Sequence, residues 1–281
     1  MDFSKYHGIG NDFVMIADPG DAVRLGARTV TRLCDRRFGI GGDGVIRVAP
    51  ARAGGDLLMD YINSDGSVGE MCGNGIRCLA LFALERDLAT KRTLRVETGA
   101  GIKVVEIQED GRVRVDMGAP EFKPGSIPVL WDGADALHAK IELGEGIVEA
   151  ACVGMGNPHA VLFVDDPAAV PVKTLGPELE HHRLFPNRVN VEFVAVRGPD
   201  RIEMRVWERG SGETLACGTG ACAAAVAARL LRGTDSTVTV VLSGGELEIS
   251  WSGRGDGSRP VEMTGTATKS FEGTFDLEAY R

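Results

Sequence analysis

Residues 70–78 read EMCGNGIRC and residues 215–225 read LACGTGACAAA, so the chain carries two similar cysteine motifs. In each motif a cysteine precedes Gly-x-Gly, and an apolar run follows. Cys72 and Cys217 lie 145 positions apart. A motif that recurs at such a distance indicates an internal repeat, and a repeat would decide the fold of the whole chain.

Other segments support a duplication. Three more pairs of segments keep the same order at offsets of 145 or 146 positions: 8–11 with 154–157, 59–63 with 204–208, and 115–117 with 261–263. One such match would be weak evidence, whereas four in the same order are not plausible as chance. The sequence therefore predicts two copies of one domain.

The local pattern predicts the same elements in both copies. Short β-branched runs alternate with glycine-rich turns and predict antiparallel strands at 94–97, 111–117, 237–242 and 246–251. Two segments, 75–87 and 220–231, are apolar on nearly every side and predict buried helices. We expect an α+β fold of two similar, duplicated domains, each an antiparallel strand-rich barrel-like sheet around a central helix, with the active site in the cleft between them.

The repeat also predicts the domain boundaries. We expect an N-terminal domain at residues 1–120, which carries Cys72, and a C-terminal domain at 121–265, which carries Cys217. The C-terminal tail, 266–281, is expected to pack on the first domain.

A glycine-rich segment at 39–44 matches G-x-G-x-x-G, which also occurs in dinucleotide-binding sites. In those sites a strand precedes the motif and a helix follows it. Here a helix is expected before it, at 30–38, and a strand after it, at 45–48. We interpret the segment as a turn.

Composition excludes several classes of protein. The chain has 281 residues, of which 43% are hydrophobic, and a net charge of −9 with scattered acidic residues. This charge argues against nucleic acid or an anionic membrane surface as a partner. The first residues lack an apolar signal segment, and no apolar stretch is long enough to span a bilayer. We expect a cytoplasmic protein.

The six cysteines do not predict a metal site or a disulfide framework. In an unexported chain of this length they are expected to be reduced. The sequence has no CxxC, and no histidine accompanies either cysteine pair at a spacing that suits zinc. We expect no metal, and we interpret Cys34, Cys78, Cys152 and Cys222 as small buried residues.

Cys72 and Cys217 stand where a thiol can do chemistry. A helix N-terminus favours a thiolate, and its free N–H groups can bind a carboxylate. Two thiols on opposite faces of one carbon could invert a stereocentre, because one thiolate removes a proton while the other thiol delivers one. We expect the helix ends to lower the pKa of the thiols, and repulsion to leave only one of them charged.

Five motifs together resemble the diaminopimelate epimerase family: HGIGNDF at 7–13, MCGNG at 71–75, MGNPHAV at 155–161, WERGSGET at 207–214 and ACGTG at 216–220. The resemblance runs from about residue 3 to 275. It implies an isomerase without cofactor that interconverts LL-2,6-diaminopimelate and meso-diaminopimelate in lysine and peptidoglycan biosynthesis. It also implies a cytoplasmic homodimer.

The resemblance implies a role for each matching residue. Cys72 and Cys217 would be the acid/base pair, and His159 and Glu208 would tune the pKa of the thiols. The N–H groups that hold the reacting carboxylate would come from Gly73, Asn74, Gly218 and Thr219. The remaining substrate ligands would be Asn11, Asn63, Asn157, Asn190, Glu208 and Arg209. Some family members carry Gln at the position of Gly44, which can contribute only its backbone here.

Three alternatives stay open on sequence alone. Proline and hydroxyproline racemases share the two-thiol architecture, but their first motif resembles MCGHG rather than MCGNG. A PhzF-like isomerase would share the fold without keeping both cysteines. A redox sensor could use Cys72 and Cys217 as a reversible disulfide, although such a sensor does not explain the polar ligands.

Overall fold

The computed structural model describes residues 1–144, 146–254 and 258–280, and the chain forms two compact units. Unit 1 is Met1–Val115 together with Thr264–Arg281, and unit 2 is Asp116–Met263. The chain therefore passes from one unit to the other twice. Residue 281, the last of the expected tail, lies outside the described residues.

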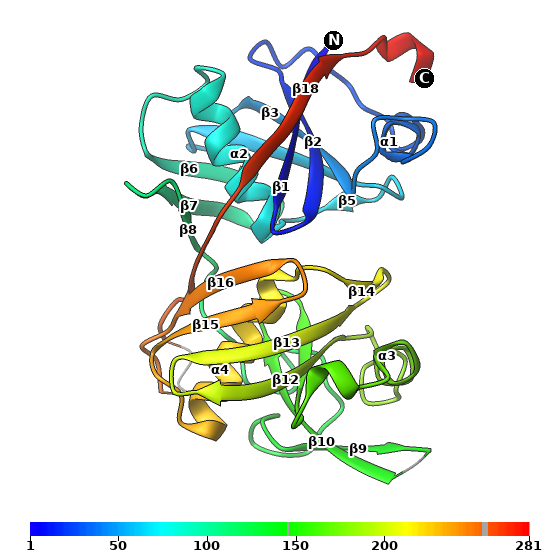
Figure 1. Cartoon of the computed structure of the whole chain (residues 1–281), viewed down its shortest axis with the longest axis vertical. Coiled ribbons are helices and arrows are strands. Elements are labelled where there is room, and N and C mark those ends of the chain that lie inside the picture. The colour runs from blue at the N-terminus through cyan, green and yellow to red at the C-terminus, as the bar shows by residue number, and fades with distance from the viewer. Residues whose placement is uncertain (145, 255–257, 281) are drawn as a thin grey trace. The chain divides into compact units, whose positions relative to one another are not determined.

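Each unit is built mainly of strands, with two α-helices (Figure 1). Unit 1 contains β1 (Asp2–Gly8), β2 (Asn11–Ala17), α1 (Ala27–Cys34), β3 (Gly44–Pro50), β4 (Leu57–Asn63), β5 (Val68–Gly69), α2 (Gly73–Glu85), β6 (Thr93–Thr98), β7 (Gly101–Ile107), β18 (Thr268–Thr274) and η2 (Leu277–Tyr280). Unit 2 contains β9 (Ala139–Leu143), β10 (Gly146–Gly154), β11 (Pro158–Phe163), η1 (Pro167–Ala169), α3 (Val172–Glu180), β12 (Asn190–Gly198), β13 (Arg201–Glu208), β14 (Gly212–Thr214), α4 (Gly218–Arg232), β15 (Thr237–Leu242) and β16 (Gly245–Ser250). Two strands run across the boundaries, β8 (Val113–Asp116) and β17 (Glu262–Gly265).

The order of strand pairings is the same in the two units. In unit 1, β1 pairs with β2, β2 with β3, β3 with β4, β4 with both β5 and β6, and β6 with β7. In unit 2, β10 to β16 repeat these pairings, with β13 next to both β14 and β15. This repetition confirms the predicted duplication.

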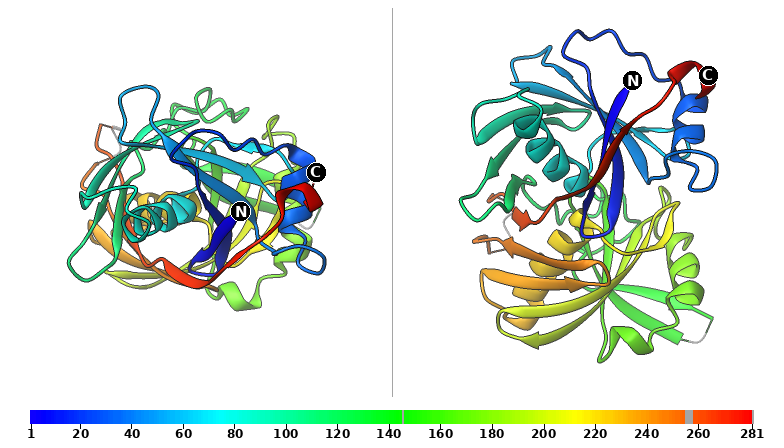
Figure 2. Two further views of the ribbon diagram at one scale, coloured as in Figure 1. Left: turned by 90° about the horizontal axis from the view of Figure 1, so that it is seen from above. Right: turned by 45° about the horizontal axis from the view of Figure 1, so that its top comes forward.

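One strand is added to each copy of the sheet. β18, near the end of the chain, pairs antiparallel with β1 near its beginning, and the two strands run side by side in both views of Figure 2. In unit 2, β9 takes the equivalent place beside β10.

Most strand pairs are antiparallel, as expected, and four pairs are parallel. β2–β3, β4–β6, β11–β12 and β13–β15 are parallel. Parallel neighbours need a crossover connection, which a hairpin cannot provide. The helices provide it here: α1 lies between β2 and β3 in the sequence, and α2 lies between β4 and β6. In unit 2, α3 and α4 take these places.

The sheet of each unit wraps around one apolar helix. α4 contacts β10, β11, β12, β13, β15 and β16, and α2 contacts β1, β2, β3 and β7. Most residues of both helices are buried, which explains why neither has a polar face. The predicted helices are confirmed, and each begins two residues earlier than expected.

Two tight turns place the first asparagine of each copy. Between β1 and β2, Ile9 and Gly10 have φ angles of 46° and 90°. Positive φ at both central residues is typical of the hairpin turn that matches strand twist. Asn11 follows directly as the first residue of β2. In unit 2, Gly156 has a φ of 86°, and Asn157 follows it.

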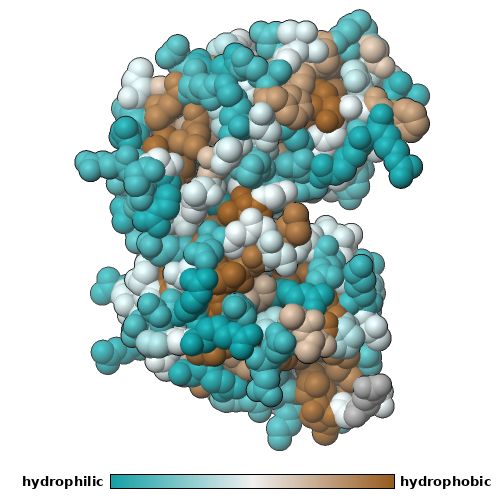
Figure 3. All heavy atoms as spheres, viewed as in Figure 1, coloured by the Kyte–Doolittle hydropathy of each residue, from teal (hydrophilic) through white to brown (hydrophobic). Residues whose placement is uncertain are grey.

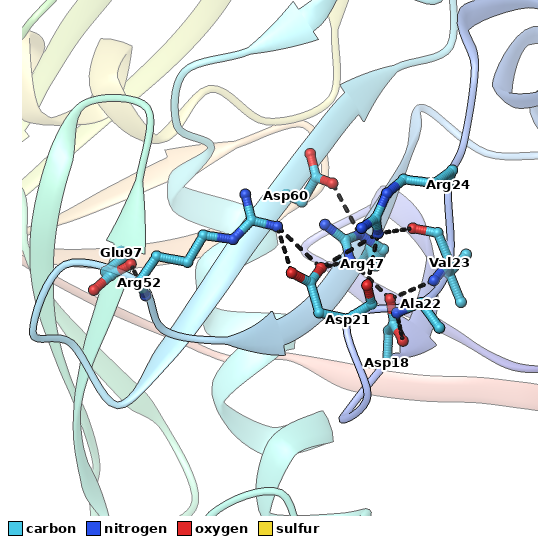
Figure 4. Close-up of polar contacts among 9 residues, drawn as sticks. All are labelled: Asp18, Asp21, Ala22, Val23, Arg24, Arg47, Arg52, Asp60 and Glu97. Carbon is cyan, nitrogen blue, oxygen red and sulfur yellow. Dashed lines mark hydrogen bonds and ion pairs between the residues drawn. The ribbon is translucent and has the colours of Figure 1, made fainter.

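A buried arginine fastens the loop after β2 to the sheet of unit 1 (Figure 4). Arg47, on β3, is 4% exposed and lies within 2.9 Å of three carboxylates, those of Asp18, Asp21 and Asp60. Arg52 also pairs with Asp21. We interpret this cluster as structural, because each charge in it has an opposite partner.

The visible surface of both units is largely hydrophilic, with smaller apolar patches (Figure 3). None of the helices within 1–144, 146–254 and 258–280 is long and apolar enough to cross a membrane. Across the same described ranges, no group of three or more His, Cys, Asp and Glu side chains is arranged to hold a metal ion.

Candidate active site

In each unit a cysteine lies at the N-terminus of the central helix. Cys72 is the N-cap of α2, and its sulfur accepts a hydrogen bond from Gly75 N at 3.4 Å. Cys217 is the N-cap of α4 and accepts one from Gly220 N at 3.4 Å. In both cases one backbone N–H group of the first turn donates to the sulfur, as expected for a side chain that caps a helix.

In unit 1, three predicted residues come together, and we name this group the first half-site: Cys72, Asn11 and Asn74. The Asn11 oxygen Oδ1 accepts hydrogen bonds from Asn74 Nδ2 at 3.1 Å and from the Cys72 thiol at 3.5 Å. Asn11 Nδ2 donates to Asp43 Oδ2 at 2.7 Å. Asp43 was not predicted from the sequence, and it fixes which end of the Asn11 amide faces the thiol.

Asn63 and Gly44 lie beside each other on neighbouring strands. They are register partners in the β3–β4 pair. Asn63 Nδ2 donates to Ser67 Oγ at 3.0 Å, so this amide also serves the turn that follows β4. A Cβ atom at Gly44 would lie 2.6 Å from the Tyr61 ring, so this position has no room for a side chain.

In unit 2, five predicted residues come together, and we name this group the second half-site: Cys217, Thr219, Asn157, His159 and Glu208. The Cys217 sulfur lies 3.6 Å from Thr219 Oγ1, which accepts a hydrogen bond from Asn157 Nδ2 at 3.3 Å. The Asn157 oxygen lies 2.9 Å from His159 Nε2.

A second carboxylate, which the sequence analysis missed, lies behind His159. His159 Nδ1 and Glu192 Oε1 are 2.7 Å apart, and both side chains are fully buried. The signal in the sequence is a glutamate inside the apolar run NVEFVAV at 190–196. A fully buried glutamate is rare unless it is paired, and here the pair is with a histidine.

Asn190 holds the backbone around Arg209. Asn190 is 3% exposed, donates from Nδ2 to Pro158 O at 2.9 Å, and accepts from Arg209 N at 2.9 Å. The Arg209 guanidinium is exposed and donates to Asn187 O at 3.1 Å. An exposed guanidinium beside the site is suited to bind a carboxylate.

The expected lowering of the thiol pKa is wrong for Cys217. Burial raises the pKa of this thiol well above its ordinary value, and the charges of Glu208 and Glu192 raise it further. The hydrogen bonds from Thr219 and from Gly220 N oppose this shift without overcoming it. Cys217 therefore favours the protonated thiol form, because burial together with two acidic side chains outweighs the helix end.

The surroundings of Glu208 also shift the pKa of its carboxyl group. Burial raises the pKa of its carboxyl group, while hydrogen bonds from Thr214 and Cys217 and the nearby His159 lower it. The Thr214 hydroxyl donates to Glu208 Oε1. The carboxyl group is thus held in one orientation beside the Cys217 thiol.

The remaining cysteines are all buried, as the sequence analysis expected: Cys34, Cys78, Cys152 and Cys222. Burial raises the pKa of Cys34, Cys78 and Cys152 to about 12. None of these three is a thiolate at neutral pH.

Both units are similar in sequence to proteins of a known family. A family model for diaminopimelate epimerase matches residues 3–123 and 151–270. The chain is 48% identical over 283 residues to a diaminopimelate epimerase of Synechococcus elongatus, and the alignment covers 99% of each chain. It is 49% identical over 287 residues to one of Moorella thermoacetica, with 99% of this chain and 100% of the relative covered.

Solved structures with the same fold include other isomerases. A hydroxyproline epimerase from Agrobacterium vitis has a TM-score of 0.71 at 14% identity, covering 97% of this chain and 91% of that one. A PhzF-family phenazine biosynthesis protein from Bacillus anthracis has a TM-score of 0.66 at 16% identity, covering 97% and 98%. At such low identity these likenesses concern the fold. The family match over both units and the close full-length relatives show that the chain belongs to the diaminopimelate epimerase family.

Proposed function

We propose that the chain interconverts LL-2,6-diaminopimelate and meso-diaminopimelate without a cofactor, with Cys72 and Cys217 as its acid/base pair. The observation that carries this proposal is that a cysteine caps the same helix in both copies of a duplicated fold. The four other cysteines of the chain are buried, and none of them is the N-cap of a described helix. The names of the close relatives supply the substrate.

The reaction exchanges one proton for another at a carbon atom. A thiolate on one face takes the Cα proton, and the electron pair is delocalised into the adjacent carboxylate. The thiol on the other face then donates its proton to the same carbon. The product has the opposite configuration, and the two sulfurs have exchanged protonation states. N–H groups at the helix ends stabilise the extra negative charge on the carboxylate.

The two thiols have different surroundings, which suits a reaction in which one is the base and the other is the proton donor. Cys217 is 4% exposed and lies beside Glu208 and Glu192, so it favours the protonated form. Cys72 is half-buried and contacts amide groups. We therefore assign Cys217 as the proton donor and Cys72 as the base, which acts once its thiol has released to solvent the proton that it donates to Asn11.

The polar side chains around the thiols would bind the rest of the substrate. Diaminopimelate has an ammonium and a carboxylate at each end. The exposed Arg209 would pair with the distal carboxylate, and the oxygen atoms of Glu208 and an asparagine would accept from the distal ammonium. The ligands we propose are Asn11, Asn63, Gly73, Asn74, Asn157, Asn190, Glu208, Arg209, Gly218 and Thr219, with a backbone contribution from Gly44.

The pathway and the assembly are part of the same proposal. The resemblance supports a place in lysine and peptidoglycan biosynthesis, in the cytoplasm, and a homodimer. Sedimentation equilibrium of the purified chain measures the assembly directly.

Proton NMR of the reduced protein with LL-diaminopimelate in D2O tests the proposed reaction. We expect the α-proton signal to disappear and the meso isomer to form with no cofactor added. Cys72→Ser and Cys217→Ser should each slow this by about 10²-fold or more, the usual contribution of a general acid or base. Full activity in either variant contradicts the two-thiol mechanism.

The same experiment separates the alternatives. Exchange with proline or hydroxyproline in place of diaminopimelate would indicate a racemase for those substrates. Loss of all exchange in the reduced parent protein would favour a redox role for the cysteines.

A further inference from the structure

Asn11 and Asn157, which follow the hairpin turns, have their side-chain amides oriented in opposite ways. In the first half-site, Asn11 Nδ2 donates to Asp43 Oδ2 at 2.7 Å, and this carboxylate also pairs with Arg36. A carboxylate accepts hydrogen bonds and donates none, so it fixes the amide. The Asn11 oxygen is therefore the group that faces Cys72, at 3.5 Å.

In the second half-site the amide is turned the other way. The Asn157 oxygen lies 2.9 Å from His159 Nε2, and Asn157 Nδ2 donates to Thr219 Oγ1 at 3.3 Å. Asn157 therefore presents an N–H group to the N-terminus of α4, whereas Asn11 presents an oxygen to the N-terminus of α2. With the Asn157 oxygen facing the ring, a proton on His159 Nε2 completes the hydrogen bond between them.

His159 also faces an acceptor on its other side. Its Nδ1 lies 2.7 Å from Glu192 Oε1, and neither side chain has any exposed surface. An imidazolium, protonated at both ring nitrogens, would satisfy the carboxylate oxygen beside Nδ1 and the amide oxygen beside Nε2 together. Glu192 Oε2 is buried with no hydrogen-bond partner in the described part of the chain. A carboxylate buried in this way is stable beside a positive charge.

This buried pair has no counterpart in the other copy. Phe13 pairs with Gly44 as His159 pairs with Asn190, so Phe13 is equivalent to His159. By the same register, Ile46 stands where Glu192 stands. A Cβ atom at Gly75 would lie 2.7 Å from Ile46 Cδ1, and one at Gly220 would lie 2.7 Å from Glu192 Oε1, so the two side chains occupy the same place.

We propose that Glu192 is a positioning residue: it keeps His159 doubly protonated, and the imidazolium holds Asn157 with its N–H group toward the mouth of α4. Asn157 then donates to a carboxylate oxygen of the substrate, whereas Asn11 accepts from an N–H group or a thiol. The two similar groups of side chains thereby present unlike hydrogen-bonding atoms, an oxygen from Asn11 and an N–H group from Asn157. This role in substrate binding rests on the proposed function.

Other titratable groups surround the pair. Glu208 lies near it on β13, and Cys217 lies near it at the start of α4. Cys152 contributes from β10. Glu208 and Glu192 are the acidic groups near His159.

Nitrogen NMR of the protein labelled with ¹⁵N-histidine tests the charge state without relying on activity. The chain has five histidines, and the double variant His159→Phe/Glu192→Ile identifies the signals of His159. It installs the two residues that unit 1 carries at these places, so its packing has a precedent in the same fold. We expect both His159 nitrogens of the parent to be protonated at pH 7.5, and Nε2 to lose its proton in Glu192→Gln.

Kinetics then test the consequence for binding. With Nε2 unprotonated, the Asn157 amide turns and presents its oxygen to the substrate carboxylate. We expect Glu192→Gln to raise KM for LL-diaminopimelate about tenfold at pH 8, the loss of one charge-assisted hydrogen bond, with a smaller change in kcat. The ratio of the variant KM to the parent KM should fall as the pH is lowered to 6, because acid restores the imidazolium.

The outcomes separate the two proposals. A singly protonated His159 in the parent, or an unchanged His159 signal in Glu192→Gln, overturns the role of Glu192. A thermally destabilised Glu192→Gln whose KM ratio does not depend on pH also overturns it, because a purely structural residue behaves in this way. Loss of the Nε2 proton in a chain with no epimerase activity supports the charge state and contradicts the proposed function instead.

Discussion

At the scale of single residues, the third residue of each central helix shows how differently the two half-sites are supported. A Cβ atom at Gly75 would lie 2.7 Å from the end of the Ile46 side chain, which can rotate away. One at Gly220 would lie 2.7 Å from Glu192 Oε1 and 3.2 Å from the Cys217 sulfur. The carboxylate cannot withdraw without breaking its hydrogen bond to His159.

We therefore predict that Gly220→Ala impairs activity more than Gly75→Ala. Each should cost about 1–3 kcal/mol of stability through overpacking. Gly220→Ala should in addition lower kcat/KM by about tenfold relative to Gly75→Ala, because it displaces the thiol and its carboxylate neighbour. Urea unfolding and steady-state kinetics on the matched pair measure the two effects. Equal kinetic losses would contradict the claim that Glu192 is held rigidly.

At this scale, many residues of the candidate site can be predicted from the sequence, but the pKa values of their side chains cannot. The cysteines and asparagines recur at fixed offsets, and so the repeat alone singles out Cys72, Cys217, Asn11 and Asn157. The pKa of Cys217 could not be predicted in the same way, since it depends on burial and on carboxylates that approach from β12 and β13. Those contacts are set by strand register, which the motif around Cys217 does not contain.

At the scale of elements, the first turn of α2 depends on a fully buried arginine. The Arg77 guanidinium donates to Gly73 O at 3.2 Å, to Asn74 Oδ1 at 2.9 Å and to Thr266 O at 3.2 Å. It thereby joins the start of the helix to the segment that leads into β18. Position 222, which is equivalent to Arg77 in α4, is a cysteine.

We predict that Arg77→Leu destabilises unit 1 by at least about 1.5–3 kcal/mol, because buried acceptors lose a charged donor. It should also raise KM, since Asn74 and Gly73 belong to the proposed carboxylate site. Arg77→Lys keeps the charge but reaches fewer acceptors, so an intermediate loss is expected. Chemical unfolding followed by kinetics in native buffer separates these effects, and a KM unchanged in Arg77→Leu would show that the helix mouth needs no such support.

The elements themselves were only partly predictable. The repeat predicts that both units share the same elements in the same order, and the apolar helices are evident because they lack a polar face. The direction of strand pairing does not follow from β-branched runs, which look alike in parallel and antiparallel sheets. The four parallel pairs could have been inferred only from the helices that intervene between the strands.

At the scale of the whole molecule, duplication has placed the two proposed acid/base residues on one polypeptide. The units are joined twice by the chain, at 115–116 and at 263–264. A covalent link of this kind makes the second thiol available at a high effective concentration. The proposed mechanism therefore predicts that one chain supplies both thiols for each substrate.

Mixing two inactive variants tests this prediction. Cys72→Ser and Cys217→Ser are unfolded together and refolded, so that any subunits can exchange, and epimerisation of LL-diaminopimelate is then measured. We expect no activity above that of the separate variants, because every chain lacks one member of the pair. Parent protein refolded with the double variant Cys72→Ser/Cys217→Ser is the control, and its activity should fall only in proportion to dilution. Activity that reappears in the mixture would mean that thiols of different chains act on one carbon, and the duplication would then have to be explained by something other than the pairing of acid and base within a chain.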